Sequence, residues 1–181
     1  WLSRVRRFAL ATDRQIMIAQ PPDQSILEDQ LRCAIGGEVR FDRLARTLYA
    51  TDAGIHEIIP VGVVFPRDAK DVAAIVKVCR GRGVAIIPRG AGTGLAGGAV
   101  GAGVQIDFSR HMNRIDAPDL SSMTIRVQAG VVLDELNVVL APHGVRFAPD
   151  VATSSRATIG GMAGNNSCGT RSIRYGIMRD N

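Results

Sequence analysis

The chain has 181 residues, of which 46% are hydrophobic and 22% are charged, a composition typical of a folded globular domain. No apolar run approaches the roughly 20 residues of a membrane-spanning helix, so we expect a soluble protein without a transmembrane segment. The formal charge of +5 comes largely from arginines among the first 14 residues, and lysines and aromatic residues are few. We therefore expect no nucleic-acid partner.

The cysteines do not suggest a metal site or a disulfide framework. Cys33, Cys79 and Cys168 are odd in number, far apart and without CxxC spacing, and the three histidines are equally scattered. We expect no metal, and a location in the reducing cytoplasm or peripheral to the inner membrane. Cys168 is expected to be a small turn residue rather than a redox thiol.

The first part of the chain divides into an extension and a helical segment. Residues 1–24 are interpreted as an extension that is disordered or upstream of the native start. Met17 is a plausible start, so residues 1–16 are expected to lie upstream of the folded protein, and this arginine-rich stretch is alternatively a targeting peptide. Residues 25–55 are expected to be an N-terminal helical segment. The capping box of Ser25 and Glu28 and the glycines at 36 and 37 predict a helix over 26–35, followed by irregular or short helical structure.

A βαβ unit is predicted from residue 61. The apolar runs 61–65 and 84–88 are typical of strands, and Asp68 is a cap for the helix between them, which ends at Gly81 and Gly83. The two strands are expected to be parallel, with a right-handed crossover. The inner face of the helix is expected to consist of Val72, Ile75, Val76 and Cys79, with Cys79 a core residue rather than a nucleophile.

Residues beyond 103 predict a third strand at 104–108, two strand-like runs around the turn at 118–122, and an amphipathic helix within 131–144. The inner side of that helix is expected to carry Val132, Leu133, Leu136, Val139 and Leu140.

Seven of the fourteen residues from Gly90 to Gly103 are glycine, between two predicted strands. Residues 92–97 match GxGxxG, the fingerprint of an NAD-binding Rossmann fold, but the glycines that follow disfavour the helix which that fingerprint requires. A loop without a ligand is the second interpretation, disfavoured by its scarcity of charge. The third is an anion-binding loop, in which backbone N–H groups converge on a diphosphate and the Thr93 hydroxyl adds a donor.

Three motifs, PRGAGTGLAGG, VQAGV and APDVATSSRATIGGMAGNNSCGTRSIRYG, resemble the FAD-binding domain of the vanillyl-alcohol-oxidase (PCMH) type. The resemblance spans about Ile26 to Asn181 and is to the branch of D-lactate dehydrogenases, glycolate oxidase flavin subunits and D-2-hydroxyglutarate dehydrogenases. It implies an α+β fold of two α/β subdomains. The first, residues 56–110, would be a small parallel βαβ layer, and the second, residues 111–181, an incomplete and more antiparallel layer.

The resemblance also implies a set of FAD neighbours. Around the pyrophosphate it places Pro88, Arg89, Gly90, Ala91, Gly92, Thr93, Gly94 and Leu95. Near the flavin it places Asp150, Val151, Ser155, Thr158, Gly160, Gly161, Asn166 and Gly169. Thr93 stands where some relatives carry the histidine of a covalent flavin link, so non-covalent FAD is expected.

In this family the flavin accepts a hydride from a 2-hydroxy acid such as D-lactate, glycolate or 2-hydroxyglutarate. No catalytic base is identified, and the fragment alone is expected to be inactive. The substrate site and an iron–sulfur cluster are expected in the rest of a longer chain, whose electron acceptor and oligomeric state the sequence leaves unknown. The alternative functions are a non-catalytic nucleotide-binding module and an NAD-binding Rossmann-like domain.

Overall fold

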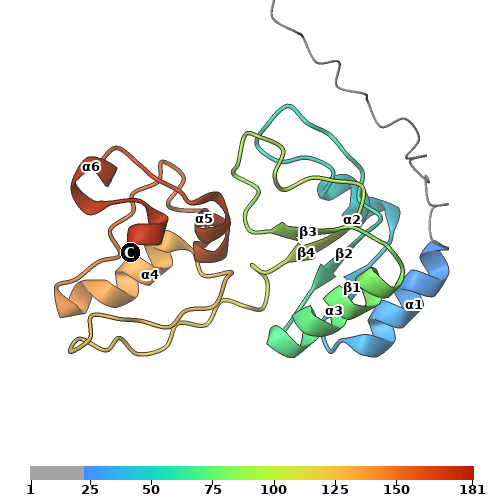
Figure 1. Cartoon of the computed structure of the whole chain (residues 1–181), viewed down its shortest axis with the longest axis horizontal. Coiled ribbons are helices and arrows are strands. Elements are labelled where there is room, and N and C mark those ends of the chain that lie inside the picture. The colour runs from blue at the N-terminus through green and yellow to red at the C-terminus, as the bar shows by residue number, and fades with distance from the viewer. Residues whose placement is uncertain (1–22) are drawn as a thin grey trace, which may run out of the picture.

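The computed structural model describes residues 23–181, and the expectations for residues 1–22 lie outside this range (Figure 1). Two lobes are joined by residues 109–114: a sheet lobe, residues 23–108, and a C-terminal lobe, residues 115–181. The sheet lobe contains α1 (Gln24–Ala34), β1 (Glu38–Arg40), α2 (Arg43–Leu48), β2 (Gly62–Phe65), α3 (Ala69–Gly81), β3 (Ile86–Arg89) and β4 (Val104–Asp107). The C-terminal lobe contains α4 (Leu133–Leu140), α5 (Ile159–Asn165), α6 (Ser172–Tyr175) and the 3₁₀ turns Ala141–His143 and Met178–Asp180.

The four strands form one mixed sheet in the order β1-β2-β4-β3. Strands β2 and β3 both run parallel to β4, whereas β1 pairs antiparallel with β2. The strands of the predicted βαβ unit are therefore parallel, but β4 lies between them. The expected α+β fold class is confirmed.

Helix α3 forms where its sequence predicts it. The Asp68 carboxylate accepts hydrogen bonds from the N–H groups of Lys70 (2.8 Å) and Asp71 (2.9 Å), which stabilises the first turn. Ile75 and Cys79 are buried against the sheet, as predicted, but Val76 is 39% exposed. Cys79 is 1% exposed and belongs to the core of the sheet lobe, and this burial raises the pKa of its thiol to about 11.

Helix α1 begins earlier than the sequence predicted, and its cap is a different residue. Asp23 is the N-cap, and its carboxylate accepts from both the N–H and the hydroxyl of Ser25. Glu28 pairs with Arg32 instead of closing a capping box. The predicted capping box is wrong because an aspartate two residues upstream satisfies the free N–H groups first. The earlier start aligns the fully buried Leu27 and Leu31 with α3, in the core of the sheet lobe.

Strand β1 was expected to be irregular structure. Its three residues pair with β2 through the register Val39 to Val64, and only Val39 among them is buried. A strand with one buried side chain gives no period-two pattern, which explains why the sequence did not reveal it. The short helix α2 follows, capped by the Asp42 carboxylate.

The C-terminal lobe has a hydrophobic core of its own, made by Val131, Leu133, Leu136, Leu140, Ala157, Ile159 and Met162. Val139, expected on the inner side of α4, is 39% exposed. The two strand-like runs form only isolated antiparallel bridges, Ile115 to Val127 and Asp119 to Thr124. From these runs, Ile115, Ile125 and Val127 are partly buried against the core of this lobe.

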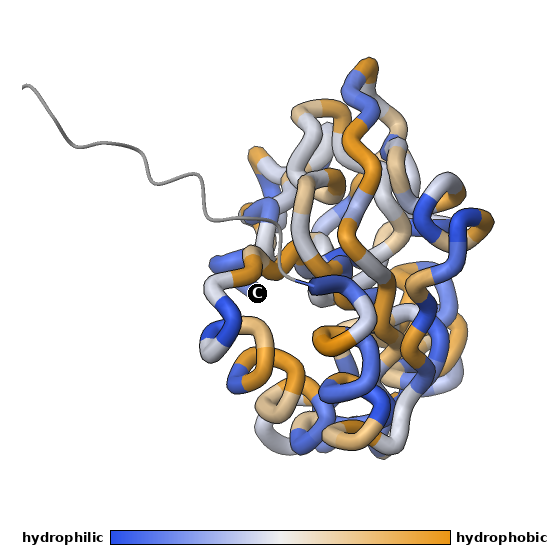
Figure 2. The backbone as a smooth tube through the Cα atoms, turned by 90° about the vertical axis from the view of Figure 1, so that its right-hand side faces the viewer, coloured by the Kyte–Doolittle hydropathy of each residue, from blue (hydrophilic) through white to orange (hydrophobic). Residues whose placement is uncertain are grey.

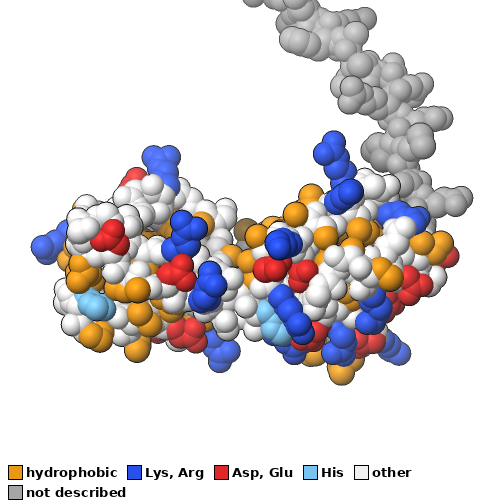
Figure 3. Space-filling model, turned by 90° about the horizontal axis from the view of Figure 1, so that it is seen from below, with side chains coloured by type: hydrophobic (Ala, Val, Ile, Leu, Met, Phe, Trp, Pro, Cys, Tyr) orange, Lys and Arg blue, Asp and Glu red, His pale blue; other side chains and the backbone are white. Residues whose placement is uncertain are grey.

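Hydrophobic and hydrophilic residues alternate along the backbone, as Figure 2 shows, in keeping with helices that bury one face. Within residues 23–181, every helix is too short or too polar to cross a membrane. The face seen in Figure 3 mixes basic and acidic side chains over both lobes, which meet at a narrow waist.

Candidate functional site

A pocket of about 460 Å³ opens between the two lobes, at the carboxyl ends of β3 and β4. In sheets with parallel strands, this edge is the usual place for a ligand. The sheet lobe contributes Tyr49, Arg89, Gly90, Ala91, Thr93 and Asp107 to the lining, the joining segment contributes Ser109, and the C-terminal lobe contributes Val132, Ser155, Arg156 and Thr158.

The glycine-rich loop after β3 borders this pocket and carries main-chain N–H groups without hydrogen-bond partners among residues 23–181. Within the described part of the chain, no residue accepts a hydrogen bond from the N–H groups of residues 90–98. A Cβ added at Gly94 or Gly98 would meet nothing within 4 Å, so the protein's own packing does not require glycine there. An open run of donors without side chains can surround an anion closely.

Two other glycines of this loop are required by the fold itself. A Cβ at Gly90 would collide with the Thr158 hydroxyl, which shows that the loop lies directly against the C-terminal lobe. Gly92 has a φ of +67°, and its Cβ position points at the Arg89 guanidinium. Glycine at 90 therefore allows the lobes to approach, and glycine at 92 allows the loop to turn.

The Arg89 side chain makes hydrogen bonds and a ring contact within the protein. Its guanidinium donates to the carbonyl oxygens of Ala99 (3.0 Å) and Thr51 (2.9 Å). It also lies over the Tyr49 ring, 5.1 Å from the ring centre, a cation–π contact. Arg89 thus ties the start of the loop to its far end and to the segment after α2.

The half-buried Tyr49 and the buried Asp107 form a hydrogen-bonded pair in the pocket lining. The Tyr49 hydroxyl donates to Asp107 Oδ2 at 2.5 Å, and Asp107 Oδ1 accepts from the N–H and the hydroxyl of Ser109, each at 2.7 Å. Burial, and then the hydrogen bond to the Asp107 carboxylate, raise the pKa of Tyr49. The Asp107 carboxylate therefore has bonds on both oxygens.

Sequence reasoning missed Tyr49, Asp107, Ser109, Val132 and Arg156 as pocket residues. The alternation of polar Gln105 and Asp107 with apolar neighbours in β4 could have pointed to Asp107, but the other four have no such signal. Gln105 and Asp107 lie on the face of the sheet that meets Tyr49, and the Gln105 amide donates to the Tyr49 carbonyl at 2.7 Å. Buried polar residues on alternate positions of a short strand indicate a polar contact on that face.

The second glycine cluster begins at Thr158, whose hydroxyl accepts from Gly161 N–H at 3.2 Å and caps α5, as predicted. Gly160 lies against Ala129, to whose carbonyl its N–H donates at 2.8 Å. Thr158 and Ser155 reach the pocket, whereas Gly160 and Gly161 support the turn behind them.

Of the predicted FAD neighbours, the structure brings together Arg89, Gly90, Ala91, Thr93, Ser155 and Thr158. The others are outside the pocket lining: Pro88, Gly92, Gly94, Leu95, Asp150, Val151, Gly160, Gly161, Asn166 and Gly169. Whether members of either group contact the cofactor remains a prediction.

Three predicted FAD neighbours outside the pocket lining hold the C-terminal segment in place: Asp150, Asn166 and Gly169. Asp150 accepts from the Arg171 N–H (3.1 Å) and the Thr170 hydroxyl (3.2 Å), and Gly169 packs on its carbonyl oxygen. Asn166 ends α5 with a φ of +47°, and its side chain accepts from the N–H group of Arg179. These contacts account for Asp150, Asn166 and Gly169 without a ligand.

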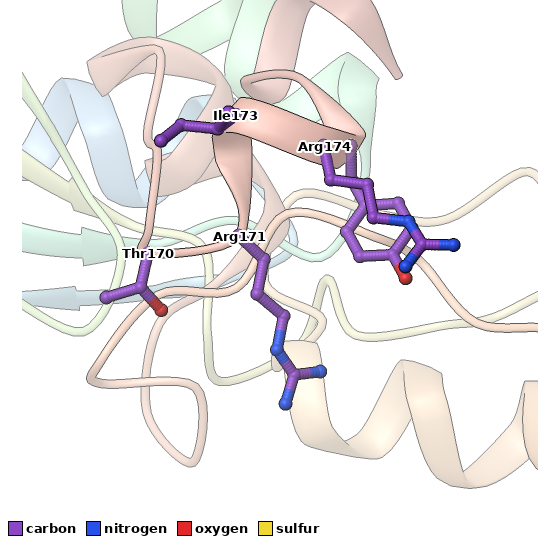
Figure 4. A pocket seen from close by; sticks show the side chains of 5 residues that line it. Thr170, Arg171, Ile173 and Arg174 are labelled. Carbon is purple, nitrogen blue, oxygen red and sulfur yellow. The ribbon is translucent and has the colours of Figure 1, made fainter.

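A smaller pocket of about 290 Å³ lies at α6, lined by Thr170, Arg171, Ile173, Arg174 and Tyr175. Figure 4 shows that Arg171 and Arg174 leave this turn in directions different from that of Ile173. Arg174 lies over the Tyr175 ring at 5.2 Å, and Arg171 is 3.7 Å from the Asp150 carboxylate. Both basic side chains therefore have partners within the chain.

Apart from Tyr49, the residues that line the larger pocket fall, with the open loop, within a region that matches a known family, the FAD binding domain, over residues 60–181. The chain belongs to this family. The Rossmann interpretation finds no support, because the FAD binding domain forms no helix between β3 and β4, where GxGxxG would require one.

Known proteins similar to this FAD binding domain include D-2-hydroxyglutarate dehydrogenase of Pseudomonas putida, 44% identical over 147 residues. That match covers 80% of the chain but 15% of the relative, so the chain spans a small part of that protein's length. Glycolate oxidase subunit GlcD of Bacillus subtilis is 33% identical over 150 residues, 81% of the chain and 32% of the relative. The solved structure of an alkyldihydroxyacetonephosphate synthase superposes with a TM-score of 0.77 and 27% identity, over 89% of this chain and 36% of that one.

The described residues fit an FAD diphosphate. The loop offers N–H donors that no group within residues 23–181 uses, and a Cβ would have open space around it at Gly94 and Gly98. Thr93, which lines the pocket, has no nucleophilic nitrogen for a covalent flavin link. The FAD binding domain can therefore provide a cradle of main-chain donors for a nucleotide.

Proposed function

We propose that this chain is the diphosphate-holding part of an FAD-dependent dehydrogenase of D-2-hydroxy acids, with D-2-hydroxyglutarate as the first candidate substrate. The observation that carries the proposal is the loop at residues 90–98 within a matched FAD binding domain: its N–H groups have no acceptor within residues 23–181, and its residues Gly90, Ala91 and Thr93 line an interlobe pocket. The 44% identity to a D-2-hydroxyglutarate dehydrogenase supports the choice of substrate.

Bound FAD supplies an acceptor for the hydride that leaves the carbon bearing the substrate hydroxyl. The residues of this chain would bind and orient that cofactor. Main-chain N–H groups of residues 90–94 would donate to the diphosphate, and the Thr93 hydroxyl would add a donor. Arg89, Tyr49 and Asp107 would keep the loop in the conformation that directs these donors inward.

FAD binding is proposed to be non-covalent, because Thr93 replaces the histidine that forms the link in some relatives. The catalytic base, the substrate site and an iron–sulfur cluster are proposed to belong to other parts of the full-length protein, located in the cytoplasm or at the inner membrane surface. The length of the D-2-hydroxyglutarate dehydrogenase, of which this chain matches 15%, leaves room for such parts.

The visible spectrum of the purified full-length protein, followed by anaerobic addition of D-2-hydroxyglutarate, D-lactate or glycolate, tests the proposal. We expect flavin absorption that bleaches fastest with D-2-hydroxyglutarate and is unchanged by L-2-hydroxyglutarate. Acid precipitation should release the flavin into the supernatant, which checks the non-covalent link. Bound flavin that none of these acids reduces would point to a non-catalytic nucleotide-binding module, and absence of flavin would overturn the proposal.

A further inference from the structure

We propose that Arg156, and not Arg89, supplies the positive charge that faces the diphosphate of the bound nucleotide. The inference rests on the proposed function, since it assigns roles within the same pocket. Among residues 23–181, these two are the only arginines in the pocket lining, and no lysine or histidine of that range lines it. The structure gives them different surroundings.

The Arg89 side chain holds the glycine-rich loop in place. Two of its guanidinium nitrogens donate to carbonyl oxygens, at Ala99 and Thr51, and its face covers the Tyr49 ring. These bonds use two of the five N–H donors of the guanidinium, and turning the group toward a phosphate would break the bonds that fix both ends of the loop. Arg89 is therefore a positioning residue.

Arg156 is exposed, and its side chain does not share the hydrogen-bonding role of Arg89. Within residues 23–181 its side chain takes part in no ion pair or hydrogen bond. Its main chain is fixed, because its own N–H and that of Ala157 both donate to the Thr153 carbonyl, at 2.8 and 2.7 Å. The turn is also tied to α4 by the bond from Leu133 N–H to the Ala157 carbonyl. An anchored turn thus holds a free guanidinium at the pocket.

The charge balance of the pocket favours an anion beside Arg156. Asp107 is the only carboxylate that the described part of the chain contributes to the lining, and it is 5% exposed, with one oxygen bonded to Tyr49 and the other to Ser109. A diphosphate would bring negative charge to the wall formed by Gly90, Ala91 and Thr93, whose N–H groups have no partner within the described residues. A guanidinium hydrogen-bonds phosphate oxygens strongly, and salt weakens such an exposed pairing.

The experiment measures the dissociation constant of FAD for the flavin-depleted full-length protein over a series of NaCl concentrations. The variants are Arg156→Gln, Arg156→Lys, Arg89→Gln and Arg89→Lys. Arg126→Gln is the matched control, because it removes an exposed charge outside the pocket. Competition by ADP and by adenosine separates phosphate recognition from recognition of the base and ribose.

We expect Arg156→Gln to weaken FAD binding about tenfold at low salt, to flatten its salt dependence and to weaken ADP but not adenosine. Arg156→Lys should recover most of the affinity because it keeps the charge. Arg89→Gln should weaken FAD with a salt dependence like that of the wild type, and Arg89→Lys should not rescue it, since lysine cannot reproduce both carbonyl bonds and the ring contact.

The opposite pattern, in which Arg89→Gln flattens the salt dependence and Arg156→Gln leaves it unchanged, would overturn the inference while FAD binding itself stands. Failure of the wild-type protein to bind FAD would instead overturn the proposed function. Thermal unfolding of each flavin-depleted variant shows whether it is folded. If Arg89→Gln unfolds, the comparison of Arg156→Gln with Arg156→Lys and Arg126→Gln still decides the role of Arg156.

Discussion

Gly90 lies so close to Thr158 that a Cβ at position 90 would overlap the Thr158 hydroxyl, although 67 residues separate the two in the sequence. Gly90 follows β3 in the sheet lobe, and Thr158 caps α5 in the C-terminal lobe. The contact therefore fixes the distance between the lobes on one wall of the pocket.

Gly90→Ala should destabilise the flavin-depleted protein by about 1 to 3 kcal/mol, because the extra methyl group forces the lobes apart or displaces Thr158. FAD affinity should fall as well. Urea unfolding and flavin fluorescence titration would measure the two effects. Gly81→Ala is the matched control, since its Cβ meets nothing within 4 Å and it ends α3 far from the pocket. Equal stability of the Gly90→Ala variant and the wild type would contradict the close contact.

Gly94→Ala should behave differently. Its Cβ would have no neighbour within 4 Å and its φ lies outside the left-handed region, so the stability of the flavin-depleted protein should change by less than about 1 kcal/mol. FAD affinity should nevertheless drop at least severalfold, because the methyl group would occupy space that the diphosphate needs. Unchanged FAD affinity in a titration would show that this part of the loop does not touch the cofactor.

Tyr49→Phe removes the donor to the buried Asp107 carboxylate and leaves one of its oxygens without a protein partner. The expected loss of stability is about 1 to 3 kcal/mol, the usual cost of an unpaired buried group. Urea unfolding at neutral pH would measure it. Tyr175→Phe serves as the comparison, because Tyr175 is 43% exposed, and its substitution should change the stability little.

The three cysteines should differ in reactivity with a thiol reagent such as Ellman's reagent at pH 8. Cys33 and Cys168 are exposed and should react quickly, whereas Cys79 is 1% exposed, and its raised pKa keeps it protonated. Labelling followed by peptide mapping would identify the modified sites. Rapid modification of Cys79 in the native protein would contradict its place in the core.

Alkaline pH should weaken the fold in part through the same thiol. The pKa of Cys79 is raised from 9.0 to about 11, so burial favours the neutral form in the folded state. This contribution to stability is fully present below pH 9 and is lost as pH rises through about 11. The unfolding free energy of Cys79→Ala, measured at pH 8 and at pH 11, should therefore fall less than that of the wild type.

Local rules were sufficient for the elements with strong patterns. The Asp68 cap and the spacing of Ile75 and Cys79 gave α3, and short apolar runs gave β2 and β4. They failed where a competing residue was close, as with Asp23 beside Ser25. They also failed where a strand buried a single side chain, as β1 does with Val39.

The pocket was harder to predict than the elements around it. The glycine loop and Thr158 have recognisable motifs, but Tyr49, Asp107 and Arg156 reach the pocket only through tertiary packing. Their approach depends on the hydrogen bond between Tyr49 and Asp107 and on the anchoring of the 153–157 turn to α4. Neither contact has a local pattern in the sequence.

Each lobe has a separate hydrophobic core, and the nucleotide pocket takes its walls from both. A ligand held there would act as a non-covalent clamp, because separating the lobes would first require releasing it. A saturating concentration of cofactor would then raise the free energy of unfolding of the two lobes together. Release of flavin and separation of the two lobes would thus be coupled equilibria.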